Sequence, residues 1–328
     1  MPHAMDRIEI LLATYNGAAF LNQQLVSIKS QTHRNWRLIV RDDGSTDKTP
    51  EIIEAFHARH PDKVVVLRDE DGNLGLVRNF SRLMEHAGAG YVAFCDQDDV
   101  WKPEKLELSL QKMRALEAEH GSEKPLLVFS DLAVVDQNLK VIRISFWKYQ
   151  GLRPERCNAL GRLLFQNVVT GCTALMNRTL VERSVPLPAE ALVHDWWVAL
   201  VAAAFGFAGH LPEPTVLYRQ HGENILGARP LRLTALPHLL RQFLGAYQRH
   251  RASVLSRFTR AEAFLERFDG SLSDDQAAAL NLFVQIPTRN IIARLACVLK
   301  NSMSPSGFWR ACLYVFLSSG KPRKVASG

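Results

Sequence analysis

Long apolar runs and a cysteine framework are both missing from this sequence of 328 residues. No uninterrupted apolar stretch approaches the ~20 residues that a membrane-spanning helix needs, and residues 311–317 are typical of the longest runs. The five cysteines are odd in number and widely spaced, so they fit neither a disulfide framework nor a zinc pattern. The N-terminal residues show no basic segment followed by an apolar one and a cleavage site. These absences favour a protein of the reducing cytoplasm.

Internal repeats and low-complexity stretches are also missing, and 47% of the residues are apolar against 22% charged. That composition excludes a disordered or fibrous chain and predicts about two folded domains. The net charge of +7 is unevenly distributed: residues 229–328 hold 15 Lys and Arg against 5 Asp and Glu, whereas residues 1–228 hold 25 against 28. A basic region of this kind attracts phosphate-rich partners. Nucleic acid is not the expected one, because no aromatic platforms are interleaved with the basic residues.

Short apolar runs alternate with helical patterns through the first part of the chain. The runs that are expected to form strands are 8–12, 38–40, 64–67, 91–95, 126–135 and 215–218. Strands that alternate with helices predict an α/β fold with a mostly parallel sheet covered by helices on both faces. An apolar stripe with helical spacing runs from Leu236 to Tyr247. The expected organisation is a domain over 1–228, with halves 1–135 and 136–228, and a helical basic region over 229–328.

Polar clusters follow four of these runs, at 14–16, 42–45, 73–79 and 96–99. In open α/β sheets, ligands bind outside the carboxyl ends of the parallel strands. One polar cluster would be an ordinary loop. Four clusters at the same edge of a sheet predict a ligand site.

The cluster after the fourth run holds three carboxylates in four positions: Asp96, Asp98 and Asp99. Such charges repel one another unless a cation lies among them. A hard divalent ion with oxygen ligands, Mg²⁺ or Mn²⁺, is the natural partner, and it would share its ligands with substrate phosphates. The alternative is an acidic loop that caps the helix expected after Pro103. The second acidic loop, at Asp43, favours the metal and phosphate.

Taken together in their order and spacing, these stretches resemble glycosyltransferase family 2. The stretches are residues 10–16, 40–47, 73–79 and the triplet Asp96-Gln97-Asp98. The resemblance covers about residues 6–228. It implies the GT-A fold, a Rossmann-like and mostly parallel sheet flanked by helices, with a helical C-terminal extension. It also implies metal-dependent transfer of a sugar from a nucleotide diphosphate, with Asp98 as a metal ligand of the DxD motif.

The resemblance implies a set of positions around the nucleotide sugar. They are Ala13, Thr14, Tyr15, Asn16, Asp42, Asp43, Arg78, Asp96, Gln97 and Arg219. Tyr15 and Asp43 would hold the base, and Arg78 would lie near the base or the phosphate. Asp96 would contact the ribose or the sugar. Ala13 departs from relatives that often carry a hydroxyl, so a base contact there must come from the backbone. For Arg219, a diphosphate contact and a surface ion pair both stay open.

Asp195 is the expected general base, which takes the proton of the acceptor hydroxyl as the sugar is transferred with inversion. It lies at the start of an apolar helix, where the helix dipole stabilises the anion. The alternative is a simple helix cap. Trp196 and Trp197 offer flat faces to an acceptor sugar, but at least one of them could equally be a core residue. Gly171 lines either the acceptor pocket or a plain buried strand.

His221 is the second expected metal ligand, by the resemblance, although a lone histidine is more often an ordinary polar residue. The strings 194–197 and 218–222 are similar to those of bacterial rhamnosyltransferases that build surface polysaccharides such as O-antigen of lipopolysaccharide. That similarity implies dTDP-L-rhamnose as donor and a saccharide linked to polyprenyl diphosphate as acceptor. The alternatives are a UDP-hexose donor, a nucleotidyltransferase, and a carbohydrate-binding protein without activity.

The Gln-X-X-Arg-Trp motif of processive synthases is absent, which favours a single sugar addition. The basic C-terminal region either packs on the catalytic body or lies on an anionic membrane surface through residues 308–316. The expected location is therefore the cytoplasm, with peripheral contact to the inner face of the cytoplasmic membrane.

Overall fold

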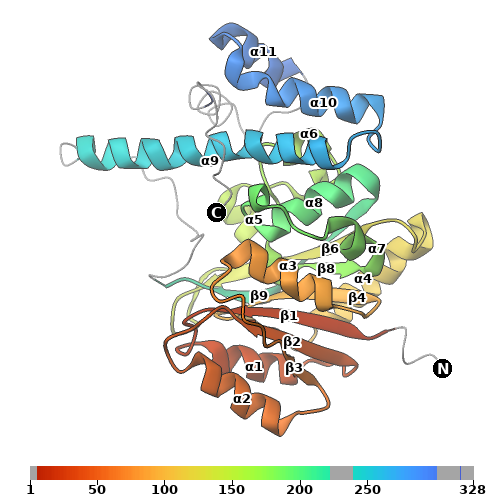
Figure 1. Cartoon of the computed structure of the whole chain (residues 1–328), viewed down its shortest axis with the longest axis vertical. Coiled ribbons are helices and arrows are strands. Elements are labelled where there is room, and N and C mark those ends of the chain that lie inside the picture. Colours follow the sequence, from red (N-terminus) through yellow and green to blue (C-terminus); the bar gives the residue numbers. More distant parts are fainter. Residues whose placement is uncertain (1–5, 222–238, 301–317, 319–328) are drawn as a thin grey trace. The chain divides into compact units, whose positions relative to one another are not determined.

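The computed structural model of the chain describes residues 6–221, 239–300 and 318, and it divides them into two compact units (Figure 1). The first unit takes its residues from 1–158, 168–187 and 193–228. The second takes them from 159–167, 188–192 and 229–328. The segment 308–316, expected at a membrane surface, lies outside the described residues, and so do the side chains of the stripe from Leu236 to Tyr247.

The first unit is built on one mixed sheet of nine strands in the order β3-β2-β1-β4-β8-β6-β9-β5, with β7 paired to β6. The strands are β1 (Ile8–Thr14), β2 (Trp36–Asp42), β3 (Val64–Val66), β4 (Tyr91–Asp96), β5 (Val100–Trp101), β6 (Leu126–Val135), β7 (Val141–Arg143), β8 (Leu175–Asn177) and β9 (Phe207–Arg219). The first four strands of this order are parallel, which the alternation of runs and helices predicted. Strand β8 then enters antiparallel between β4 and β6. The α/β fold class is confirmed, although the second half of the sheet is more mixed than expected.

Helices lie on both faces of this sheet (Figure 1). In chain order they are α1 (Leu21–Lys29), α2 (Thr49–Arg59), α3 (Leu76–His86), α4 (Lys105–His120), α5 (Phe146–Gln150), α7 (Arg178–Ser184) and α8 (His194–Phe205). On one face, Ile10 and Leu12 of β1 pack in a core with α1, α2 and α4. On the other, Phe94 of β4 contacts Phe80 of α3 edge to face. Strands covered on both faces bury consecutive side chains, which explains their uninterrupted apolar runs.

The second unit is helical, as expected for the C-terminal region. Its helices are α6 (Leu160–Leu163), α9 (Leu239–Arg267), α10 (Asp274–Val284) and α11 (Ile291–Lys300). Phe258 and Phe283 are fully buried, and their rings lie 4.8 Å apart between α9 and α10. Helix α10 begins at a capping box in which Ser273 and Gln276 each satisfy the other's backbone N–H. No described helix combines the length and apolar character that crossing a membrane requires.

Candidate functional site

The loops after β1 and β4 are held together by the side chain of Gln97. Its Oε1 accepts a hydrogen bond from the backbone N–H of Tyr15 at 2.8 Å, and its Nε2 donates to the Tyr15 carbonyl at 2.9 Å. Gly17 leaves room for this amide, since a Cβ there would lie 2.2 Å from Oε1. Gln97, which was predicted to lie near the nucleotide sugar, therefore uses both polar atoms of its side chain to contact the Tyr15 backbone. The Tyr15 side chain itself is 49% exposed at the edge of the sheet.

The loops after β1 and β2 are joined by three further predicted residues. Thr14 donates from its hydroxyl to Asp42 at 2.8 Å, and the other Asp42 oxygen accepts from the backbone N–H of Ser45. Asn16, in a left-handed conformation with φ of 48°, accepts from the Thr46 N–H. Ala13 pairs in register with Arg41 on one side and Asp96 on the other. The two loops thus form one connected edge beside β4.

Asp43 is buried, and both of its carboxylate oxygens are engaged within the protein. They accept from the N–H groups of Leu74 and Gly75 at 2.8 Å, and Arg41 donates to one of them at 2.6 Å. Arg41 also makes a bidentate ion pair with Asp69 at 2.8 Å, and these carboxylates raise the pKa of the guanidinium. Asp43 therefore fixes the loop that leads into α3. Arg78 is exposed in the first turn of that helix.

The two predicted metal ligands meet at the ends of β4 and β9. The Nε2 atom of His221 lies 2.8 Å from Oδ2 of Asp98. The His221 ring packs against Phe20, with the ring centroids 4.8 Å apart. The carboxylate oxygen suits Mg²⁺ or Mn²⁺, and the imidazole nitrogen beside it favours the transition metal, Mn²⁺, of these two.

Arg219 is buried beneath this pair, with 1% of its surface exposed. Its Nε donates to the Asp98 carbonyl at 2.8 Å, Nη1 donates to the Gln137 carbonyl and Nη2 donates to the Gln23 side chain. Its backbone N–H donates to Asp99. All three guanidinium nitrogens thus contact the protein, and the structure places Arg219 where it positions the Asp98 loop.

Negative charge accumulates around Asp96, which is partly buried at the end of β4. Burial raises the pKa of Asp96 well above its usual range, and the carboxylates of Asp98 and Asp195 raise it further. A divalent cation among these side chains would relieve the repulsion, so the residues fit the ion that the sequence predicted.

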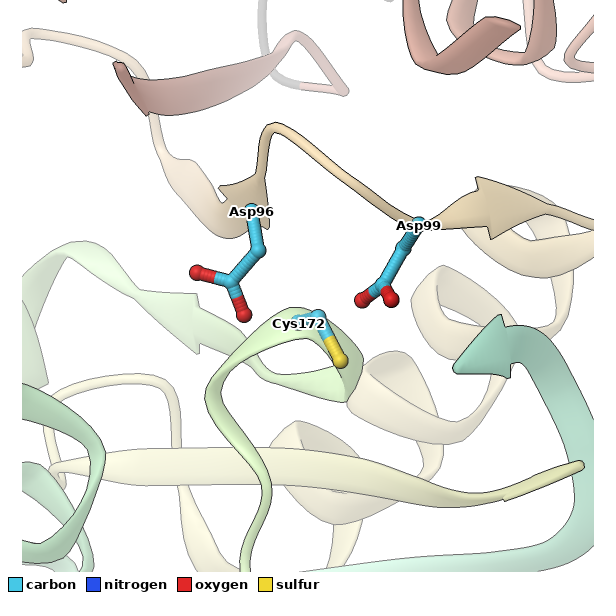
Figure 2. Close-up of side chains that lie close together, drawn as sticks. All are labelled: Asp96, Asp99 and Cys172. Atoms are coloured by element: carbon cyan, nitrogen blue, oxygen red, sulfur yellow. The ribbon is translucent and has the colours of Figure 1, made fainter. Parts of the chain in front are cut away.

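A second grouping lies below Asp96, where ligand atoms of Asp96, Asp99 and Cys172 are within 4.8 Å of one another (Figure 2). Figure 2 shows both carboxylates directed toward the Cys172 side chain. Burial raises the pKa of Asp99 and of the Cys172 thiol well above their usual ranges. A protonated thiol is a poor ligand for a hard ion, so we interpret Asp99 and Cys172 as the buried floor of the site. The sequence interpretation had counted Asp99 among the carboxylates around a cation and had given it no separate role.

Asp195 lies in the first turn of α8 and accepts a hydrogen bond from the Gly171 N–H at 2.9 Å. His194 packs beneath the same glycine: a Cβ on Gly171 would lie 2.6 Å from the His194 ring. That ring stacks on Phe80 at 3.7 Å, and burial lowers its pKa to about 3. Gly171 and His194 together therefore fix the position of the Asp195 carboxylate.

Trp196 and Trp197 follow Asp195 in α8 and have different surroundings. Trp197 is fully buried and belongs to the core, which is one of the two alternatives for this pair. Trp196 is half-buried.

Comparison with known proteins finds similar sequences in one family. Residues 9–121 match the model of glycosyl transferase family 2. The dTDP-rhamnosyl transferase RfbG of Shigella flexneri is 27% identical over 228 residues, which cover 66% of this chain and 74% of that protein. The putative teichuronic acid biosynthesis glycosyltransferase TuaG of Bacillus subtilis is 33% identical over 106 residues, which cover 32% of this chain and 41% of the relative.

Solved structures share the fold. The mannosyltransferase PcManGT from Pyrobaculum calidifontis, in complex with GDP-Man and Mn²⁺, superposes with a TM-score of 0.55 over 95% of this chain and 85% of its own, at 17% identity. Staphylococcus aureus TarS, residues 1–349, in complex with UDP-GlcNAc, gives a TM-score of 0.52 at 16% identity, over 95% of this chain and 90% of its own. Residues 9–121 are thus similar to glycosyl transferase family 2, and the solved structures share the fold of the chain around them.

Proposed function

We propose that the chain transfers a single sugar, with inversion, from a nucleotide diphosphate to a hydroxyl group of a saccharide acceptor in a metal-dependent reaction. The contact between Asp98 and His221, at 2.8 Å beside Asp96 and Asp195, is the observation that carries the proposal. It brings together a pair of ligands for a metal ion and, separately, a carboxylate that can accept a proton. Sugar transfer needs both of these functions. A divalent ion bound by this pair would stabilise the negative charge on the departing diphosphate.

The remaining roles belong to the chain's own residues. Asp195 accepts the proton of the attacking hydroxyl, and the Gly171 N–H orients its carboxylate. Asp96 contacts the ribose or the sugar. Tyr15 packs against the base with its exposed ring, and Asp43 acts on the base through the loop that it holds at Leu74 and Gly75. Arg219 holds the Asp98 loop in position through its hydrogen bond to the Asp98 carbonyl.

The donor proposed is dTDP-L-rhamnose, which is supported by the similarity to RfbG over two thirds of the chain. The acceptor proposed is a saccharide linked to polyprenyl diphosphate, as used in the synthesis of O-antigen and other surface polysaccharides. A UDP-hexose is the alternative donor.

Calorimetric titration of the purified chain with dTDP-L-rhamnose, UDP-glucose and GDP-mannose, each with and without Mn²⁺, tests the proposal. We expect binding of one donor that depends on Mn²⁺ and is lost in Asp98→Ala. The matched control is Asp62→Ala, which removes an exposed carboxylate in the turn before β3. Binding of no nucleotide sugar in the presence of Mn²⁺ would refute the function, and donor binding that is as tight without Mn²⁺ as with it would refute the role of Asp98.

A further inference from the structure

We propose that residues 137–153, which include β7 and α5, form a surface that binds an anionic lipid bilayer beside the active site. The proposal rests on the proposed function at one point: a lipid-linked acceptor would be held at this bilayer. It concerns the first unit alone and is separate from the basic C-terminal region.

The apolar part of this surface is a group of aliphatic side chains that the rest of the unit leaves uncovered. Val141 is 52% exposed, Ile142 41% and Ile144 76%. Successive residues of a strand point to opposite faces, and all three residues of β7 are exposed. Neither face of β7 is therefore packed on the core. Among the described strands, β7 pairs with β6 alone.

The charged residues within this segment are all of one sign, although an acidic residue lies near each end, Asp136 and Glu155. Residues 137–153 contain no Asp or Glu. They contain four exposed cations, Lys140, Arg143, Lys148 and Arg153. Charged residues alone would protect an edge strand from pairing with another chain, but protection does not explain three exposed aliphatic side chains between them. Aliphatic groups that enter the acyl boundary and cations that contact anionic headgroups are the combination that binds a bilayer surface.

The surface is linked to the site through one side chain. Arg219 donates from Nη1 to the carbonyl of Gln137, where the β6–β7 connection begins, and from Nε to the carbonyl of Asp98. In the sheet, Val135 at the end of β6 pairs in register with Arg219. An acceptor whose lipid stays in the bilayer would thus meet the carboxyl ends of β6 and β9, where the metal ligands lie.

Co-sedimentation of the full chain with vesicles tests this surface without any sugar transfer. Vesicles of phosphatidylglycerol and phosphatidylethanolamine are compared with vesicles of phosphatidylcholine alone, at low and at moderate salt. We expect binding to the anionic vesicles that weakens as salt rises. The variant Ile142→Ser with Ile144→Ser should bind about tenfold more weakly, and Arg143→Gln with Lys148→Gln should lose the dependence on anionic lipid.

The matched control is Ile291→Ser with Ile292→Ser, which removes two aliphatic side chains, 60% and 78% exposed, from α11 of the basic C-terminal region. It should bind vesicles as the wild type does. Unchanged binding by both variants of residues 137–153, loss in the α11 variant alone, or no binding by the wild type would overturn the proposal. A wild-type dimer in gel filtration that the Ile142→Ser, Ile144→Ser variant converts to monomer would also overturn it, because the surface would then join two copies.

Failure of this proposal is distinguishable from failure of the proposed function. Donor binding in the absence of vesicles should be the same in the wild type and in the Ile142→Ser, Ile144→Ser variant. Circular dichroism and the melting temperature confirm that each variant is folded.

Discussion

The imidazole of His221 reaches the carboxylate of Asp98 at 2.8 Å, although the two residues are 123 positions apart in the chain. The contact joins the loop after β4 to the loop after β9, and Arg219 supports it from below through the Asp98 carbonyl. A site that depends on two distant loops is sensitive to small changes in either one.

Replacing either of the two proposed metal ligands, Asp98 or His221, should weaken donor binding in the presence of Mn²⁺ and leave the weaker metal-free binding unchanged. We expect a loss of tenfold or more for Asp98→Ala and for His221→Ala. Because the two side chains act on the same ion, the double variant should lose little more than Asp98→Ala alone. Calorimetric titration of the wild type and the three variants gives the four dissociation constants of this double-mutant cycle. Losses that add in full would show that the two residues act separately.

Asp195→Asn should reduce turnover about a thousandfold and leave the donor dissociation constant within about twofold of wild type. The asparagine keeps an oxygen that can accept from the Gly171 N–H, so the geometry is preserved while the base is removed. Product formation and donor titration measure the two quantities. Equal losses in both would give Asp195 a structural role.

Gly171→Ala should reduce turnover about a hundredfold in a folded protein, because the new Cβ would lie 2.6 Å from the His194 ring and displace the Asp195 carboxylate. Gly88→Ala is the control, since a Cβ there meets no atom within 4 Å. Steady-state kinetics should show the loss in turnover rather than in donor affinity. A Gly171→Ala enzyme as active as the Gly88→Ala enzyme would contradict the role of this contact.

Stability in acid should depend on His194. Burial lowers the pKa of this imidazole from 6.5 to about 3. Between these two pH values the unfolded chain therefore binds a proton that the folded chain does not. The free energy of unfolding therefore falls as the pH drops below 6.5, by about 1.4 kcal/mol per pH unit, until the pH approaches 3. His194→Phe keeps the stacking on Phe80 and removes this loss. Between pH 7 and pH 4.5, urea unfolding should show the variant gaining about 2–3 kcal/mol relative to wild type. A constant difference across that range would refute the assignment.

The first half of the fold could be predicted from the sequence, because strands buried on both faces leave uninterrupted apolar runs that are readable without tertiary information. The start of β9 at Phe207 could not, since Pro212 and Pro214 interrupt the strand and only 215–218 carried a strand pattern. The placement of β8 between β4 and β6 likewise depends on pairing between distant segments. The short strands β5 and β7 have no periodicity to detect.

The sequence predicted which types of residue lie at the site, but it did not predict the contacts that they make. The spacing of the acidic residues marked the edge where the loops meet. It could not show that Asp43 is fully engaged with Arg41 and the backbone, or that Arg219 faces the protein. An arginine inside a strand, such as Arg41, is the signal that could have indicated a buried ion pair, but its partner Asp69 lies in another loop.

The amide of Gln97 pairs with the backbone N–H and C=O of Tyr15 much as a neighbouring strand would, and it fits only because position 17 has no side chain. Glutamate at 97 would repel the Tyr15 carbonyl, and alanine at 17 would displace the amide. Any exchange of the acidic motif after β4 for that of a relative must therefore change positions 17 and 97 together.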